Sequence, residues 1–250
     1  MAETLLETRG LTRRFGALAA VNGVSLRFEE GRLHAVIGPN GAGKSTFLNL
    51  LSGELRATSG EVRFRGEEVT QATPDRLSRL GIGRTYQTAN LFPELSCSSC
   101  VWLAAQSRLR SSMLFLHPAE RHVEVGERAQ RALQACGLEG RTAQVAGQLS
   151  YGEQRQLEIA MMLATEPALL LLDEPLAGLG PDEASRIVEL LRKVAQGRTV
   201  ILVEHDMDAV FSISDAVTVL ADGRVLETGS PLQIRQSAAV REAYLGEELA

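Results

Sequence analysis

The spacing of apolar residues changes along the chain, and these changes predict its secondary structure. Residues 24–29 alternate between apolar and polar side chains, which is typical of a β-strand with one solvated face. Residues 33–37 form a short apolar run with two β-branched residues, which fits a buried strand. Similar patterns predict strands at 5–11, 60–64, 67–70, 169–172, 200–203, 216–220 and 224–228, with a helix that starts at 46–51.

The middle of the chain differs from both ends. Between about residues 95 and 163, β-branched runs are few, and residues 121–136 have a strongly helical pattern. The last third returns to alternation, with helices predicted at 181–195 and 207–213 between strands. Strands that alternate with helices predict a parallel sheet with crossover connections.

These patterns predict an α/β fold in a single domain, 1–250. We expect residues 1–94 and 165–250 to form the core, which begins with an antiparallel β subdomain. We expect residues 95–164 to form an inserted helical subdomain. The length of 250 residues and the hydrophobic content of 44% are ordinary for one core with such an insertion.

Composition narrows the possible partners. The formal net charge of −5 argues against nucleic acid as a partner, because phosphate contacts require clustered Lys and Arg. No apolar run approaches the roughly 18 to 20 residues that a membrane helix needs. The first residues include early acids and no apolar segment, so we expect no signal peptide and a soluble cytoplasmic protein.

Two of the cysteines, Cys97 and Cys100, have the Cys-x-x-Cys spacing of redox pairs and of half zinc sites. A zinc site would need a second ligand pair, and Cys136 stands alone. A redox pair would need a thioredoxin-like βαβ context, which the surrounding pattern lacks. We therefore expect reduced, incidental thiols.

A glycine-rich segment after the 33–37 strand matches the phosphate-loop pattern Gly-x-x-x-x-Gly-Lys-Ser/Thr. The segment consists of Gly38, Pro39, Asn40, Gly41, Ala42, Gly43, Lys44, Ser45 and Thr46. The glycines let consecutive N–H groups point at one anion, and the following helix adds its N-terminal dipole. We expect Lys44 to reach the β- and γ-phosphates and the Ser45 hydroxyl to bind Mg²⁺. The segment predicts a P-loop (RecA-like) NTPase that uses ATP and Mg²⁺, rather than a glycine-rich turn without function.

An acidic pair, Asp173 and Glu174, follows the apolar strand predicted at 169–172. In α/β folds, ligands bind outside the carboxyl ends of the strands. We expect Asp173 to hold Mg²⁺, directly or through water, and Glu174 to polarise the attacking water. The alternative, a solvated acidic loop end, is disfavoured by the presence of the phosphate loop.

The signature segment (Leu149–Gln154) resembles the Leu-Ser-Gly-Gly-Gln sequence of the ABC ATPase family. It opens a predicted helix shortly before the acidic pair, as in that family. The resemblance implies a second anion site, formed by the Ser150 hydroxyl, the Gly152 N–H and a helix dipole, for the γ-phosphate of ATP held by a partner subunit. The alternative for Ser150 is a plain helix N-cap, which is compatible with that role.

The chain departs from the family pattern at three positions. Tyr151 replaces the first glycine of the signature, and Glu153 replaces its glutamine. Gly180 stands where many members have an aspartate, in a loop that contacts the other subunit. Ser150 and Gly152, which face the phosphate in the family, are retained, so the resemblance implies a working site.

Three further residues match family positions. Phe15 matches the aromatic residue that stacks on adenine, although a core phenylalanine is an alternative. Gln87 matches the glutamine that touches Mg²⁺ or the attacking water and couples the nucleotide state to the membrane subunits; the alternative is a surface glutamine. His205 matches the histidine that hydrogen-bonds the γ-phosphate, against the alternative of a structural histidine.

Within the ABC family, the chain is most similar to the ATPase subunits of bacterial importers for branched-chain or hydrophobic amino acids, a group that includes urea and amide importers. The segments that carry this likeness are 84–87, 90–92, 157–160, 203–207, 213–215 and 243–246. One alternative is an ATPase subunit of a lipopolysaccharide-type exporter. Another is a soluble non-transport ABC ATPase, but such chains usually carry two ATPase units or a long coiled coil.

The resemblance also implies partners and location. It implies a second ATPase subunit, with a heterodimer favoured over a homodimer, and transmembrane permease subunits at the cytoplasmic face of the inner membrane. A periplasmic solute-binding protein is expected to deliver the substrate. Two ATP molecules would lie between the two ATPase subunits, and hydrolysis would let the dimer open.

Overall fold

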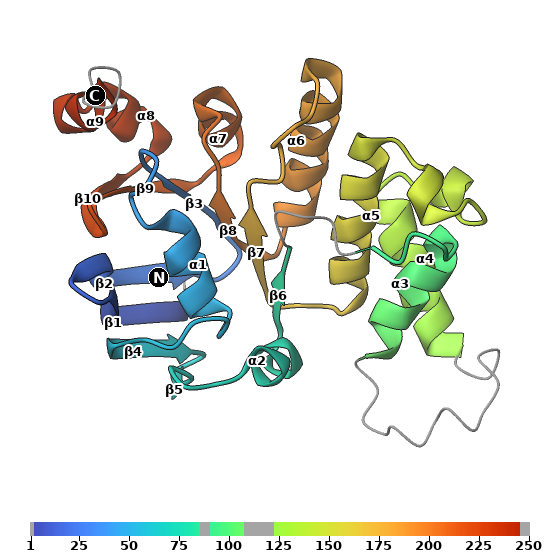
Figure 1. The fold of residues 1–250 in the computed structure, drawn as a ribbon. Helices are drawn as coiled ribbons and strands as arrows, with labels where there is room; N and C mark the ends of the chain where they lie inside the picture. Colours follow the sequence, from blue (N-terminus) through green and yellow to red (C-terminus); the bar gives the residue numbers. More distant parts are fainter. Residues whose placement is uncertain (1–2, 86–90, 108–122, 246–250) are drawn as a thin grey trace. The chain divides into compact units, whose positions relative to one another are not determined.

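The computed structural model describes residues 3–85, 91–107 and 123–245 (Figure 1). The chain divides into two compact units. The first unit comprises residues 1–82, 168–174 and 195–250, and the second comprises residues 83–167 and 175–194. Each unit is assembled from segments that are distant in the sequence, so the chain passes repeatedly from one to the other.

The first unit begins with an antiparallel sheet in the strand order β2-β1-β4-β5. In the second half of β2, the side chains of Val24, Leu26 and Phe28 are buried and those between them are exposed, as the alternating pattern predicts. The turn between β4 and β5 is formed by Arg65 and Gly66, which both have positive φ angles. The strands are β1 (Thr4–Phe15), β2 (Leu18–Glu29), β4 (Ser59–Phe64) and β5 (Glu67–Glu68).

A second, six-stranded sheet has the order β10-β9-β3-β8-β7-β6. Strand β3 runs parallel to β8 and β9, and β7 runs parallel to β8, while β10 returns antiparallel to β9. All residues of β3, β7 and β8 are buried, as expected for strands that are covered on both faces. The strands are β3 (Leu33–Ile37), β6 (Ile82–Arg84), β7 (Leu169–Asp173), β8 (Thr199–Val203), β9 (Ala216–Ala221) and β10 (Arg224–Gly229).

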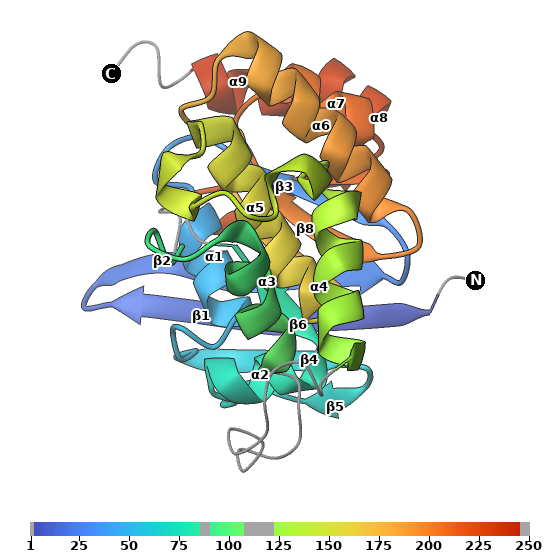
Figure 2. The ribbon, with the colours of Figure 1, turned by 90° about the vertical axis from the view of Figure 1, so that its right-hand side faces the viewer.

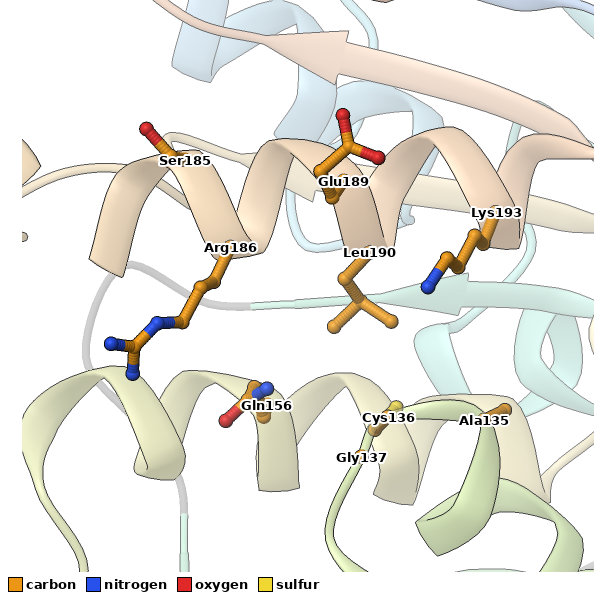
Figure 3. A pocket seen from close by; sticks show the side chains of 9 residues that line it. All are labelled: Ala135, Cys136, Gly137, Gln156, Ser185, Arg186, Glu189, Leu190 and Lys193. Atoms are coloured by element: carbon orange, nitrogen blue, oxygen red, sulfur yellow. The ribbon is translucent and has the colours of Figure 1, made fainter. Parts of the chain in front are cut away.

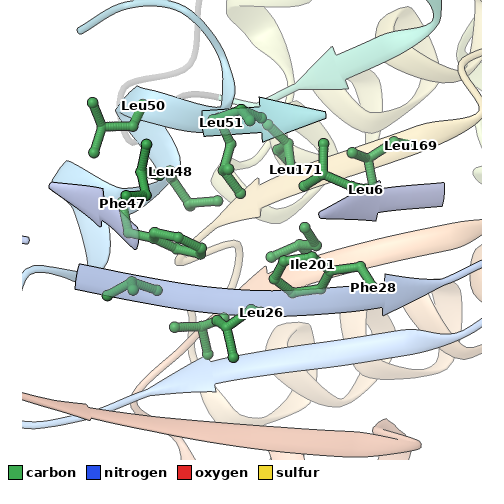
Figure 4. Close-up of a cluster of buried hydrophobic side chains, with 14 of the residues drawn as sticks. Leu6, Leu26, Phe28, Phe47, Leu48, Leu50, Leu51, Leu169, Leu171 and Ile201 are labelled. Atoms are coloured by element: carbon green, nitrogen blue, oxygen red, sulfur yellow. The ribbon is translucent and has the colours of Figure 1, made fainter. Parts of the chain in front are cut away.

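Helix α1 (Lys44–Leu51) fills the space between the two sheets of the first unit. Its residues Phe47, Leu48 and Leu51 are fully buried and pack with apolar residues of both sheets, among them Phe28 and Ile201 (Figure 4). A smaller apolar cluster joins β3 and β9 to the helices near the end of the chain. The other helices of this unit are α2 (Pro74–Leu80), α7 (Met207–Ile213), α8 (Pro231–Gln236) and α9 (Ala238–Leu245).

The second unit is helical. Helices α3, α4 and α5 pack against one another (Figure 2), and inside α5 the buried side chains of Arg155 and Glu158 form an ion pair of 2.7 Å. Cys97 and Cys100 of α3 are buried free thiols whose pKa values are raised by burial. The helices are α3 (Cys97–Gln106), α4 (Val123–Ala135), α5 (Tyr151–Ala164) and α6 (Pro181–Ala195), with short 3₁₀ turns at Glu139–Arg141 and Ala146–Gln148.

The apolar patterns locate most elements well. The strand at 33–37 and the helix at 207–213 are confirmed at the same residues. The predicted strands 5–11 and 24–29 are too short, because β1 continues to Phe15 and β2 begins at Leu18. In this longer part of the hairpin, β1 and β2 pair through several register shifts. These shifts interrupt the alternation of apolar and polar residues by which a strand is recognised in a sequence.

The arrangement of a parallel α/β sheet, an N-terminal antiparallel sheet and a group of helices agrees with the predicted P-loop NTPase fold. Within the described part of the chain, no helix is both long enough and apolar enough to cross a membrane.

Candidate functional site

Three candidate site segments of the first unit leave the parallel sheet at the same edge. Strand β8 lies between β3 and β7, and Val203 of β8 pairs with Val36 of β3 on one side and with Asp173 of β7 on the other. Parallel strands end on the same side, so the phosphate loop, Glu174 and His205 all begin within two residues of this row. This edge is where α/β folds bind their ligands.

The phosphate loop has the backbone shape that its glycines allow. Gly38 has a φ of 152°, and a Cβ there would lie 2.1 Å from the carbonyl oxygen of Leu220. Gly43 has a φ of 96°, and a Cβ there would lie 2.2 Å from the carbonyl oxygen of Ala20. Since real Cβ atoms do not approach backbone so closely, only glycine fits at either position.

The ammonium group of Lys44 is buried at the start of α1 and held by the loop itself. Its Nζ donates hydrogen bonds to the carbonyl oxygens of Gly38 at 2.6 Å and Pro39 at 2.9 Å. The loop therefore carries a positive charge in a fixed place, beside the N-terminal dipole of α1. A cradle of backbone N–H groups with one cation is suited to polyphosphate.

The acidic pair stands at the end of β7. Asp173 is only 2% exposed, so its carboxylate is held inside the edge of the sheet. Glu174 has a φ of 47°, a left-handed conformation that non-glycine residues rarely adopt, and its N–H donates to the carbonyl oxygen of Val203 at 2.9 Å. Strained backbone of this kind is concentrated at functional sites, where the surrounding structure maintains it.

His205 follows β8, and its side chain is 65% exposed. It is therefore available to a ligand, which disfavours the alternative of a structural, core histidine. Its Nδ1 lies 3.7 Å from a carboxylate oxygen of the buried Glu204, and its backbone N–H donates to the same oxygen at 3.1 Å. Glu204 therefore fixes the backbone from which the imidazole projects.

Phe15 lies near the turn of the β1–β2 hairpin and is 45% exposed. It is thus not a core phenylalanine. The guanidinium carbon of Arg13 lies 4.6 Å from its ring centroid, as in a cation–π contact. The hairpin packs against the phosphate loop through Ala20, whose carbonyl oxygen faces Gly43. An exposed aromatic ring on this hairpin suits stacking by a planar base.

The signature segment lies in the second unit, where Ser150 is the N-cap of α5. Its Oγ accepts from the N–H of Glu153 at 3.2 Å, and the Glu153 carboxylate accepts from the N–H of Ser150 at 3.0 Å, which completes a capping box. Arg141 donates to the same carboxylate at 2.8 Å. The Ser150 N–H, and then Arg141, lower the pKa of Glu153. The departure at Glu153 thus has a structural role as the cap partner of Ser150.

The departure at Tyr151 is accommodated by a neighbouring loop and by α5. The Tyr151 ring lies over Gly178, where a Cβ would be 3.3 Å from its Cε1. Arg155 donates to the Tyr151 hydroxyl at 3.4 Å, with its guanidinium carbon 5.7 Å from the ring centroid. The bulky ring therefore leaves the helix start at Ser150 intact.

Gln87 lies outside the described residues. Glu183, in the first turn of α6, was not foreseen: its Oε1 accepts from the Ser150 hydroxyl at 3.4 Å and from the Gly152 N–H at 3.3 Å. The sequence signal for it was weak, since an acidic residue in the first turn of a helix is ordinary.

Comparison with protein families connects this arrangement to known proteins. A family model described as ABC transporter matches residues 21–177, and one described as branched-chain amino acid ATP-binding cassette transporter matches residues 224–250. The high-affinity branched-chain amino acid transport ATP-binding protein BraF of Pseudomonas aeruginosa is 42% identical, over 99% of this chain and 100% of BraF. The corresponding protein LivG of Escherichia coli K12 is 38% identical over the same shares.

Solved structures agree with these matches. The ADP conformation of an ATP-binding cassette of an ABC transporter superposes with a TM-score of 0.86 at 30% identity, covering 98% of this chain and 99% of that one. A dimeric bacterial ABC transporter cassette superposes with a TM-score of 0.78 at 28% identity, covering 91% of this chain and 99% of that one.

Proposed function

This chain is an ATPase of the ABC transporter family, and we propose that it powers a branched-chain amino acid importer. One observation carries the proposal: full-length relatives at 38–42% identity are branched-chain amino acid transport ATP-binding proteins, and the C-terminal family match agrees with them. Neither the lipopolysaccharide-type exporter nor the soluble non-transport ATPase is favoured by these matches.

Nucleotide binding follows from the phosphate loop. Residues 38–46 surround the β- and γ-phosphates of ATP with backbone N–H groups, and Lys44 neutralises part of their charge. The exposed ring of Phe15 stacks on adenine. Phe15 and Ala20 belong to the β1–β2 hairpin, and Ala20 contacts Gly43 of the phosphate loop. This contact supports the placing of the adenine beside Phe15 while the phosphates lie in the loop.

The residues around the loop also suit Mg²⁺. The Ser45 hydroxyl and the Asp173 carboxylate are oxygen donors, the type of ligand that Mg²⁺ prefers, and Gln87 is expected to join them. When bound, Mg²⁺ offsets negative charge on the β- and γ-phosphates. Ser45 lies in the first turn of α1 and Asp173 ends β7, so both belong to a helix or a strand rather than to a loop.

The residues beyond the strand ends carry the hydrolytic step. Glu174 orients and polarises the water that attacks the γ-phosphate, and its strained backbone is of the kind concentrated at functional sites. The exposed His205 donates a hydrogen bond to the γ-phosphate, and Gln87 contacts the same water. The register of β7 and β8 supports this assignment, since it brings Glu174 and His205 to one edge.

A second ATPase subunit completes the site. The Ser150 hydroxyl and the Gly152 N–H of one subunit bind the γ-phosphate that the phosphate loop of the other subunit holds. Two ATP molecules thus lie between two subunits, which form a heterodimer. The helical subdomain, 95–164, inserted between 1–94 and 165–250, transmits closure to transmembrane permease subunits at the cytoplasmic face of the inner membrane.

The direct test is to identify the proteins that co-purify with this chain from detergent-solubilised membranes. We expect two permease subunits and a second ATPase subunit, with a periplasmic solute-binding protein encoded beside them. That solute-binding protein should bind leucine, isoleucine or valine. Recovery of the chain only from the soluble fraction, without permease subunits, would refute the transport function. The assignment of the chain as an ATPase would still stand.

A further inference from the structure

A carboxylate from the same chain lies on the anion-binding groups of the signature segment. Oε1 of Glu183 accepts hydrogen bonds from the Ser150 hydroxyl at 3.4 Å and from the Gly152 N–H at 3.3 Å. A Cβ at Gly152 would lie 2.8 Å from this oxygen, so the carboxylate is packed directly onto the backbone. These are the two groups that the proposed function assigns to the γ-phosphate.

Glu183 and the nearby Glu153 differ in their ion pairing. The other carboxylate of the segment, Glu153, is paired with Arg141 at 2.8 Å. Among the residues that the structure describes, no Lys or Arg pairs with Glu183. A phosphate that approached Ser150 would therefore meet two donors that are already occupied, and a negative charge that has no ion-pair partner among the described residues.

The position of Glu183 allows it to move away. It stands in the first turn of α6, where the helix dipole favours a negative charge whether or not the carboxylate bonds to Ser150. Its two hydrogen bonds to the signature segment are long and therefore weak. Moving the Glu183 carboxylate away from Ser150 therefore requires less free energy than breaking a short ion pair would. Asp182 lies beside it in the same turn and is exposed.

We propose that Glu183 is a specificity-determining residue, which occupies the signature anion site until the γ-phosphate of the partner-bound ATP displaces it. ADP has no γ-phosphate with which to displace this carboxylate. Glu183 thus sets the ATP concentration at which closure occurs. This inference rests on the proposed function, because it assumes that Ser150 and Gly152 bind the γ-phosphate.

The groove beyond this contact continues along α5 and α6. A cavity of about 360 Å³ lies between the two helices, with Gln156 on one side and Arg186 and Lys193 on the other (Figure 3). Ser185, two residues after Glu183, is also part of its lining. The start of α6 therefore borders this cavity.

The test uses the transporter complex purified through this chain, with ATP hydrolysis measured against ATP concentration. Glu183→Ala should lower the ATP concentration for half-maximal hydrolysis by about threefold to tenfold, since it removes a charged acceptor from two hydrogen bonds. Glu183→Gln keeps the shape and an acceptor oxygen but loses the charge, so it should give a smaller decrease. Inhibition by ADP, which needs only the phosphate loop, should stay the same.

Asp182→Asn is the matched control, since it removes an equal charge from the same helical turn without touching Ser150. It should leave the half-maximal concentration unchanged. If Asp182→Asn reproduces the effect of Glu183→Ala, the helix dipole accounts for it and the inference is wrong. Thermal unfolding of each variant checks that the fold is intact.

Ser150→Ala separates this inference from the proposed function. If Ser150→Ala abolishes hydrolysis and Glu183→Ala leaves the half-maximal ATP concentration unchanged or raises it, the role of Glu183 is refuted and the proposed function stands. If Ser150→Ala has no effect, the signature site itself is wrongly assigned, and both fail.

Discussion

Acidification should destabilise the first unit through one buried histidine. His34 of β3 is 7% exposed, its Nε2 lies 2.8 Å from the Thr218 hydroxyl, and its ring packs edge-on to Phe28 with centroids 4.8 Å apart. Burial lowers the pKa of His34 from 6.5 to about 4. The native protein therefore resists a proton that the unfolded chain accepts readily.

The sign and size of the effect follow from these pKa values. The folded-state pKa of His34 is depressed, so its stabilising contribution is complete above the unfolded pKa of 6.5 and is lost as the pH falls towards 4. Proton linkage then gives a loss of about 2 kcal/mol in the free energy of unfolding at pH 5, and about 3 kcal/mol at pH 4.

Urea unfolding at pH 7 and at pH 5 measures this loss. His34→Gln cannot be protonated, so its free energy of unfolding should fall by about 2 kcal/mol less than that of the wild type between the two pH values. His205→Gln is the control for the substitution itself, because it replaces an exposed imidazole rather than a buried one. An identical pH dependence in His34→Gln and the wild type would refute the reasoning.

Three further predictions concern the site and its support. Gly43→Ala forces a Cβ to within 2.2 Å of the Ala20 carbonyl oxygen, so equilibrium binding of a fluorescent ATP analogue should be lost, and retained binding would contradict the described loop shape. Glu174→Gln should bind the analogue normally but lower kcat at least about 100-fold in a phosphate-release assay; hydrolysis at the wild-type rate would refute the general-base role. Arg155→Met removes the buried ion pair with Glu158 and should lower the free energy of unfolding by about 3 to 5 kcal/mol in urea titrations, whereas a change below about 1 kcal/mol would show that this pair adds little.

The parts of the site that local geometry dictates were predictable from the sequence. The phosphate loop is an example, because the backbone angles of Gly38 and Gly43, and the space around them, admit no side chain. The glycines of the sequence pattern are therefore required by the shape of the loop itself. The row formed by Val36, Val203 and Asp173 was predictable in outline, since parallel strands present their carboxyl ends on one side.

The parts that depend on tertiary packing were not predictable. The contact between Glu183 and Ser150 joins residues 33 positions apart, and nothing in either neighbourhood specifies it. The length of the β1–β2 hairpin was underestimated for a related reason. Its outer half is held by backbone pairing through bulges around Arg13 and Arg14, which leave no alternating apolar pattern.

We conclude that this chain hydrolyses ATP to drive the import of branched-chain amino acids. To test this conclusion, ATP hydrolysis and uptake of labelled leucine are measured together, in proteoliposomes that contain the purified complex and its solute-binding protein. We predict ATP-dependent leucine uptake with the wild-type chain and, with Lys44→Ala, loss of both activities. Hydrolysis without uptake of leucine, isoleucine or valine would contradict the proposed substrate class, and unchanged hydrolysis in Lys44→Ala would contradict the assigned ATP site.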